Sequence, residues 1–202
     1  MSSYKLQINL TEKKLIILKN SLSMLKNRKI ISSDEKETYL KGFDKNIKTS
    51  DIFELKKEKI KINIISSKIN SINKGSPLED FLLEDTHYHK IIIVPKLTKK
   101  IVKQIRTTEH YNAEIFNEYE LLEDISKKVF IPKHILLSDE NKEKILKTYK
   151  YSELSKIFDT DIMARYYLMK PNDIVKIIRP SINSGESIFY RHVVPGKHDL
   201  MV

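Results

Sequence analysis

Residues 174–181 have the sequence Ile174-Val175-Lys176-Ile177-Ile178-Arg179-Pro180-Ser181, and residues 188–194 have the sequence Ile188-Phe189-Tyr190-Arg191-His192-Val193-Val194. Both stretches are rich in β-branched and aromatic residues, which favour strands. A short loop over residues 180–185 separates them, so the second strand can fold back on the first. This part of the sequence therefore predicts an antiparallel β-hairpin near the C-terminal end of the chain.

Short helices are predicted before the hairpin. Ser138-Asp139-Glu140 is a typical helix start. Three groups of apolar residues then predict helical segments: Ile145, Leu146 and Tyr149; Leu154, Ile157 and Phe158; Met163, Tyr166 and Tyr167. The last helix is expected to end before Asn172, a residue type that suits a left-handed turn position. Helices followed by a hairpin predict an α+β domain, which we place at residues 119–202.

Helices beside a sheet are predicted for residues 1–118, which gives an α/β first domain. A leucine stripe marks one face of the first helix, with Thr11 as its N-cap: Leu15, Leu18, Leu22 and Leu25. Ser32 and Glu35 have the spacing of a capping box that begins a second helix. The polar segment 44–58 is interpreted as a connector. Strands are predicted at residues 60–64, 91–94 and 113–117.

Composition restricts the classes of protein that fit the chain. It has 202 residues, no cysteine and a formal net charge of +10. No apolar run approaches the roughly 20 residues of a spanning helix, and the first residues lack the layout of a secretory signal. The sequence therefore predicts an intracellular protein without a membrane segment. The positive charge favours nucleic acid or acidic protein partners, but heavy use of Lys, Ile and Asn explains it equally well.

Two groups of polar residues are candidate sites. A basic cluster follows the apolar strand and could neutralise DNA phosphates without reading sequence, although a solvated helix face would look the same: Lys96, Lys99, Lys100 and Lys103. His87 and His89 lie close to Glu84 and Asp85 in the manner of metal ligands, but a polar approach to a strand is the better interpretation because metal sites need three or four converging ligands. We expect no catalytic residue, metal or cofactor in this chain.

Several ordered blocks of the second domain resemble one family: 131–134, 161–167, 174–181, and Gly185 with Tyr190-Arg191. They are similar to the fifth common subunit of eukaryotic-type DNA-directed RNA polymerase, whose C-terminal part forms a small polymerase subunit of its own in archaea. The first 110 residues follow the order of the eukaryotic jaw domain more loosely. Ile162, Asn172 and the loop Thr98-Lys99-Lys100-Ile101 depart from the family pattern. This drift and the Lys, Ile and Asn bias favour a giant-virus homologue.

The resemblance implies a non-catalytic polymerase subunit. Its jaw would have a restriction-endonuclease-like fold without the active site and would lie beside downstream double-stranded DNA. Its second domain would dock on the largest subunit, with one copy per complex, and the catalytic Mg²⁺ would belong to the two largest subunits. The expected location is the virion or a cytoplasmic virus factory, or the nucleus for a cellular protein. The residues expected at the largest-subunit interface are Arg165, Tyr166, Arg179, Ser181, Tyr190 and Arg191.

Less specific interpretations remain open for these residues and for the whole chain. The three arginines could pair internally with Asp161, Asp173 or Glu186, and the tyrosines could belong to the core. The chain could also be a stand-alone basic nucleic-acid-binding protein that retains the fold. A degenerate nuclease is a third possibility, because Glu54-Leu55-Lys56 has an acid-x-Lys spacing, but nuclease chemistry needs carboxylates gathered around a metal.

Overall fold

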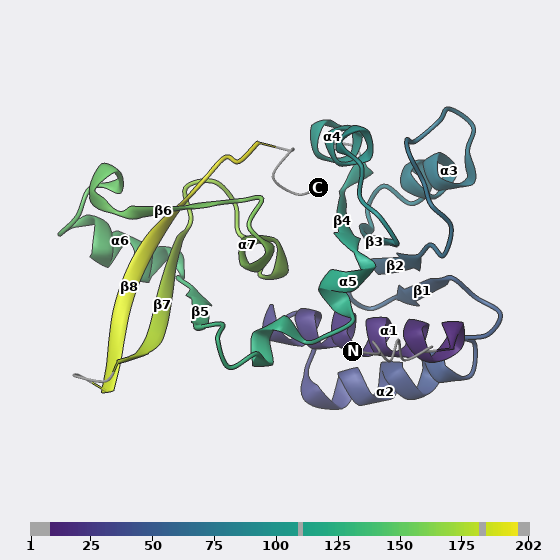
Figure 1. Ribbon diagram of the computed structural model, residues 1–202, viewed down its shortest axis with the longest axis horizontal. Coiled ribbons are helices and arrows are strands. Elements are labelled where there is room, and N and C mark those ends of the chain that lie inside the picture. The colour runs from purple at the N-terminus through teal and green to yellow at the C-terminus, as the bar shows by residue number, and fades with distance from the viewer. Residues whose placement is uncertain (1–8, 109–110, 182–184, 198–202) are drawn as a thin grey trace, which may run out of the picture. The chain divides into compact units, whose positions relative to one another are not determined.

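A computed structural model describes residues 9–108, 111–181 and 185–197 (Figure 1). The chain divides into two compact units, Met1–Asp124 and Ile125–Val202. The division follows Asp124 rather than residue 118 because the short helix α5 (Glu118–Leu121) is bonded to the first unit. Lys13 Nζ lies 2.7 Å from Glu118 Oε1, and Asn20 Nδ2 donates to the carbonyl of Leu121 at 2.9 Å.

The first unit contains a four-stranded sheet in the order β1-β2-β3-β4. Its strands are β1 (Ile52–Leu55), β2 (Ile60–Ile64), β3 (His89–Val94) and β4 (Ala113–Asn117). β1 pairs antiparallel with β2, and the other pairs are parallel. The three predicted strands are confirmed. The connector predicted at 44–58 is wrong for β1, whose four residues are too few to show a period among flanking lysines; its Phe53 and Leu55 are buried.

Helices cover both faces of this sheet: α1 (Leu10–Asn27) and α2 (Ser33–Asp44), and α3 (Pro77–Leu83) and α4 (Lys99–Thr107). Successive side chains of a strand point to opposite faces. His89 of β3 contacts Glu114, which in turn forms an ion pair with Arg28 at the end of α1. The next residue of β3, Lys90, points the other way, and its Nζ donates to the Leu82 carbonyl in α3. The first helix pair therefore lies on one face and α3 on the other, together with α4, as Figure 1 shows.

Local capping signals determine where the first two helices begin. Ser32 and Glu35 form the predicted capping box, in which Glu35 N–H donates to Ser32 Oγ at 3.1 Å and Ser32 N–H donates to Glu35 Oε2 at 2.8 Å. The N-cap of α1 is Asn9 rather than Thr11, because the Asn9 side chain accepts from the Thr11 N–H. The leucine stripe is otherwise confirmed, since three of its members are fully buried: Leu18, Leu22 and Leu25.

The second unit contains a four-stranded sheet in the order β5-β7-β8-β6. Its strands are β5 (Lys133–Leu136), β6 (Ser155–Phe158), β7 (Ile174–Ser181) and β8 (Gly185–Val194). β7 and β8 form the predicted antiparallel hairpin; residues 182–184 of its loop lie outside the described residues. The helix predicted around Ile157 is wrong. This segment is β6, which pairs parallel with β8 and buries only Ile157 among its four side chains.

The second unit also contains short helical segments. They are the 3₁₀ turns η2 (Ile125–Lys127) and η3 (Tyr151–Glu153), and the helices α6 (Asp139–Leu146) and α7 (Ile162–Tyr166). Asp161 is the N-cap of α7, and its carboxylate accepts from the Met163 N–H at 2.8 Å. The chain leaves this region through Asn172, whose φ of 72° confirms the predicted left-handed position.

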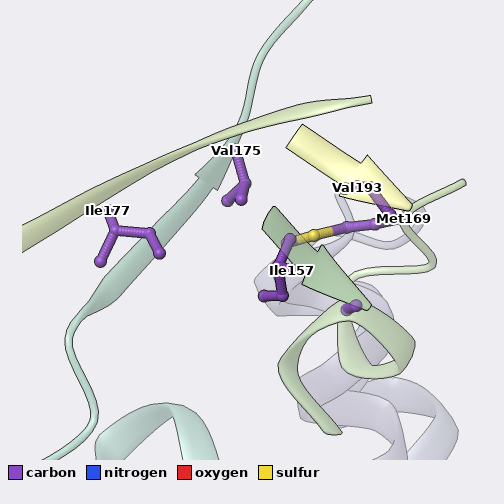
Figure 2. Packing of buried hydrophobic residues seen from close by; sticks show 6 residues of the cluster. Ile157, Met169, Val175, Ile177 and Val193 are labelled. Atoms are coloured by element: carbon purple, nitrogen blue, oxygen red, sulfur yellow. The ribbon is translucent and has the colours of Figure 1, made fainter. Parts of the chain in front are cut away.

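An apolar cluster joins α7 to the sheet (Figure 2). Val175 and Ile177 from β7 lie near Val193 from β8, and Ile157 from β6 completes the strand contribution. Ala164 of α7 and Met169 beyond its end are buried in the same cluster. The core of the second unit is therefore formed by side chains from one face of three strands and by α7, which packs on that face.

No helix in the described parts of the chain is long and apolar enough to cross a membrane.

Candidate functional site

The hairpin presents three of the six expected interface residues on one face. Residues opposite one another in an antiparallel pair share a face, and the pairs on this face are Val175 with Arg191, Ile177 with Phe189, Arg179 with Ser187, and Ser181 with Gly185. Because Val175 and Ile177 also belong to the core, we call this the core face. Arg179, Ser181 and Arg191 therefore lie together on the core face, whereas Tyr190 pairs with Lys176 on the opposite face.

His134 of β5 lies beside these arginines, because it is paired with Ile177 on the core face. Its Nδ1 lies 2.7 Å from the carbonyl oxygen of Pro132, which fixes the ring against its own backbone. Burial lowers the pKa of His134, and the positive charges of Arg191 and Arg179 lower it further. A neutral imidazole in this position orients the start of β5, and its geometry suggests no catalytic role.

The core face becomes exposed towards the hairpin loop. The guanidinium of Arg179 lies over the ring of Phe189, 5.3 Å from its centroid, and this ring is 47% exposed. Arg179 and Pro180 also line a hollow of about 380 Å³ together with Val129, Phe130 and Pro132. Val129 is 99% exposed and Phe130 is 79% exposed. We call Val129, Phe130, Arg179, Pro180 and Phe189 the hairpin patch.

Tyr166 does not lie on this surface. It is only 1% exposed, and its ring meets Tyr167 edge-on inside the second unit. The alternative that placed this tyrosine in the core is therefore the one that the structure supports, and we remove Tyr166 from the expected interface. Arg165, the preceding residue of α7, is half-buried.

Nothing in the sequence singles out Val129 and Phe130. Two adjacent apolar residues before Ile131-Pro132 could equally well have belonged to the core, and no periodicity distinguishes the two possibilities. Their exposure depends on the turn between η2 and β5, where the Ile131 N–H donates to the Lys128 carbonyl at 2.9 Å. Only the folded chain shows that this turn lies beside Arg179.

The four lysines of the predicted basic cluster are all exposed. α4 buries Ile101, Val102 and Ile105 towards the sheet, so its opposite side faces solvent. The first turn contains Lys99 and Lys100 and no acidic residue. Positive charges there oppose the helix dipole, each at a cost of about 0.3–1 kcal/mol. An anion next to this turn would offset that cost.

The candidate metal ligands are separated in the structure. His89 Nε2 lies 2.9 Å from Glu114 Oε1, whereas Asp85 accepts from Lys61 Nζ at 2.6 Å. Among the described residues, no three His, Cys, Asp or Glu side chains lie close enough to share a metal ion. In the acid-x-Lys triplet, Glu54 is half-buried and hydrogen-bonded to Tyr88, which raises the pKa of that phenol, and Lys56 is exposed. The described side chains therefore form no nuclease-like site.

Comparison with known proteins identifies the second unit first. The family model described as "RNA polymerase Rpb5, C-terminal domain" matches residues 123–193, which include η2, the hairpin and α7. The second unit is thus an RNA polymerase subunit domain. The whole chain is 34% identical over 194 residues to "DNA-directed RNA polymerase subunit 5" of Acanthamoeba polyphaga mimivirus, covering 91% of this chain and 93% of that protein. The chain therefore belongs to the RNA polymerase subunit 5 family, as the sequence resemblance predicted.

Cellular relatives match shorter parts of the chain. The Dictyostelium discoideum protein "DNA-directed RNA polymerases I, II, and III subunit rpabc1" is 36% identical over 117 residues, which cover 54% of this chain and 59% of that protein. The Thermofilum pendens protein "DNA-directed RNA polymerase subunit Rpo5" is 43% identical over 75 residues, 36% of this chain but 94% of the archaeal protein. The archaeal relative thus has the length of one unit.

Proposed function

We propose that this chain, a structural and non-catalytic subunit of a multisubunit DNA-directed RNA polymerase, docks on the largest subunit through the hairpin patch. We further propose that its first unit keeps a restriction-endonuclease-like jaw scaffold without an active site and lies beside downstream DNA. One copy of the chain would occupy each complex. Because the mimivirus relative matches along most of its length, we place that complex in the virion or in a cytoplasmic virus factory.

The observation that carries the docking proposal is the exposure of the hairpin patch. Contiguous exposed apolar surface on a soluble protein marks interaction sites. Aromatic residues and arginine are enriched at the centres of protein interfaces, where they dominate the binding energy. The hairpin patch combines Phe130 and Phe189 with Arg179, and a hollow beside them could receive a side chain of the partner. The composition and shape of this surface fit a protein partner.

Co-purification of the polymerase with a tagged chain tests this docking. Replacing Phe130 by Asp together with Arg179→Glu is expected to reduce recovery of the largest subunit by tenfold or more, because hot-spot truncations cost about 2 kcal/mol or more. The matched control is Tyr149→Asp, since this side chain is 48% exposed in the same unit but lies outside the hairpin patch. Equal recovery with both variants would contradict the proposal.

DNA contact by the first unit is supported by the exposed lysines on and before α4. Charge reversal of Lys96, Lys99, Lys100 and Lys103 is expected to weaken the hold of the assembled enzyme on downstream DNA. Log affinity falls as log salt concentration rises, and each lost phosphate contact makes this fall less steep by about 0.9. A salt titration of complex stability measures this slope, and an unchanged slope would refute the contact.

The second candidate function is a stand-alone nucleic-acid-binding protein. It is favoured by one observation, the exposed basic side of α4, which needs no polymerase to attract phosphate. A free binder would shift DNA by itself and purify without large subunits. Stoichiometric recovery with the two largest subunits supports the polymerase assignment instead.

A further inference from the structure

A second basic surface lies between α1 and α2, away from the α4 lysines. It is a groove of about 400 Å³ lined by Lys19, Lys26, Ser33, Lys36, Glu37, Leu40 and Lys41. Most of these side chains are lysines, and Glu37 is the one carboxylate among them. Lys36 bridges the two helices, since its Nζ donates to Ser23 Oγ of α1 at 2.6 Å.

The other three lysines of the groove differ from two lysines earlier on α1 and from Lys61 of β2. Lys13, Lys14 and Lys61 each form an ion pair with a carboxylate of this chain. Within residues 9–108, 111–181 and 185–197, no carboxylate forms an ion pair with the exposed side chains of Lys19, Lys26 and Lys41. Uncompensated like charges around one hollow repel each other, so an acidic partner would be favoured there.

The spacing of these charges follows the helices. Lys19 and Lys26 are seven residues apart on α1, which is about two turns or 10 Å along the axis. Ser33, Glu37 and Leu40 recur at three-and-four spacing on α2, with Lys36 and Lys41 on either side of them. The groove is therefore about two turns long, with lysines on both walls. Leu40 and the aliphatic stems of the lysines give it an apolar strip.

The groove and α4 lie on opposite faces of the sheet. Side-chain alternation on β3 separates α1 from α3, and α4 lies on the α3 side (Figure 1). A straight DNA duplex along α4 would not reach the α1–α2 side of the same unit. Glu37 in the lining also disfavours a continuous phosphodiester backbone, which carries a charge at every step. A protein segment can place its own side chains to avoid that carboxylate.

We infer that the groove between α1 and α2 binds an acidic amphipathic helix of another protein in the assembled complex. An apolar ridge of that helix would pack over Leu40, in the manner of helix-in-groove recognition. Carboxylates on either side of the ridge, three or four residues apart, would meet Lys19 and Lys26 on one wall and Lys41 on the other. The inference is independent of the hairpin patch and rests on the proposed function only in placing DNA along α4.

Carbodiimide cross-linking of the complex purified through the tagged full-length chain tests the inference. This reagent joins lysine amines to carboxylates that lie in direct contact. Peptide mapping by mass spectrometry is expected to link Lys19, Lys26 or Lys41 to aspartates or glutamates of another protein. The inference is overturned if these lysines link only to carboxylates of their own chain, such as Glu37, or form no link.

Two charge-matched variants separate the groove from the DNA-facing side. The groove variant is Lys19→Glu, Lys26→Glu and Lys41→Glu, and the α4 variant is Lys96→Glu, Lys100→Glu and Lys103→Glu. The groove variant is expected to recover about tenfold less of the cross-linked protein at low ionic strength, since three exposed pairs of roughly 0.5 kcal/mol each sum to that factor and salt screens them. It should keep its hold on DNA, which the α4 variant should lose.

Weaker DNA binding by the groove variant would make nucleic acid the occupant and would overturn the inference. Failure of the proposed function has a different signature. In that case the wild-type chain itself would not purify with the large subunits, or the α4 variant would hold DNA as tightly as the wild type. The two failures are therefore distinguishable in one set of purifications.

Discussion

Glu114 connects three elements of the first unit through its two carboxylate oxygens. Arg28 at the end of α1 donates to both of them, at 2.6 and 2.8 Å, and His89 Nε2 at the start of β3 lies 2.9 Å from Oε1. Burial raises the pKa of Glu114, but the charge of Arg28 and the hydrogen bonds from His89 and Arg28 outweigh it and hold the pKa at about 2. This bidentate pair fixes α1 along the sheet, and removing either partner would leave an uncompensated buried charge.

The lowered pKa of Glu114 predicts an acid-sensitive contribution to stability. Because the pKa in the folded protein is below the ordinary value of 4.5, the stabilisation is fully present above about pH 4.5 and is lost as the pH falls towards 2. Its size is on the order of 3 kcal/mol. Urea unfolding of the wild type and of Glu114→Gln should therefore give free energies of unfolding that differ at about pH 6 and converge on acidification. At about pH 6 a glutamate with the ordinary pKa is already ionised, so the full stabilisation is present. A difference that does not change with pH would disprove the assignment.

Gly196 is a second residue whose identity the structure explains. Its N–H donates to Asp159 Oδ1 at 2.7 Å. A Cβ at this position would lie 2.2 Å from the Oγ1 atom of Thr160, whose side chain is buried. Gly196→Ala is expected to destabilise the second unit by about 1–3 kcal/mol through overpacking. The control is Gly42→Ala on α2, where a Cβ meets nothing within 4 Å. This substitution should raise the free energy of unfolding by roughly 0.5–1 kcal/mol, because alanine loses less conformational freedom in a helix. Thermal unfolding measures both, and equal shifts would contradict the close approach.

At the scale of single elements, the core of the second unit depends on a short helix, α7. It has only five residues, yet its Ala164 is fully buried against the sheet. A helix of this length has almost no stability by itself, so its cap and its packing hold it in place. Asp161 provides the cap, because its carboxylate accepts from the Met163 N–H at 2.8 Å.

Removal of this cap tests the role of α7. Asp161→Ala is expected to lower the free energy of unfolding by about 1 kcal/mol, because the Met163 N–H loses its acceptor. Asp161→Asn should keep most of that stability, since Asn is an equally good N-cap. Denaturant unfolding of the full chain gives both values. An Asn variant as unstable as the Ala variant would show that the charge of Asp161, rather than its hydrogen bond, is what matters.

At the scale of the whole molecule, each unit has its own sheet and its own buried residues. The apolar cluster of the second unit draws all six members from residues 157–193. The archaeal relative, matched along 94% of its length by 75 residues, has the size of one such unit. A chain built in this way should not unfold as one cooperative block.

A fragment of residues 125–202 is therefore expected to fold by itself. Circular dichroism should show strand content and a cooperative, if modest, thermal transition, because small domains are marginally stable. The fragment should also recover the large subunits in a pull-down, since it contains the hairpin patch and the turn that bears Phe130. A fragment without a cooperative transition would show that the first unit is needed for the second to fold.

The elements that the sequence predicts correctly are those encoded locally. The hairpin at 174–194, the capping box of Ser32 and Glu35 and the strand at 91–94 could all be predicted, because each is encoded by neighbouring residues. The sequence predicts a helix at β6, wrongly, because its four residues have no period of their own and become a strand only by pairing with β8. β1 was missed for the same reason, since a short edge strand depends on its partner β2.

The candidate surfaces divide in a similar way. The sequence by itself determined the family, the order of most elements and the exposed lysines of α4, because motifs and periodicity are properties of contiguous residues. Only the tertiary structure decided that Tyr166 is core, that Val129 and Phe130 lie beside Arg179, and that Lys19 and Lys41 face one groove. Those relations join residues that are distant in the chain, and packing between elements, which no local pattern encodes, brings them together.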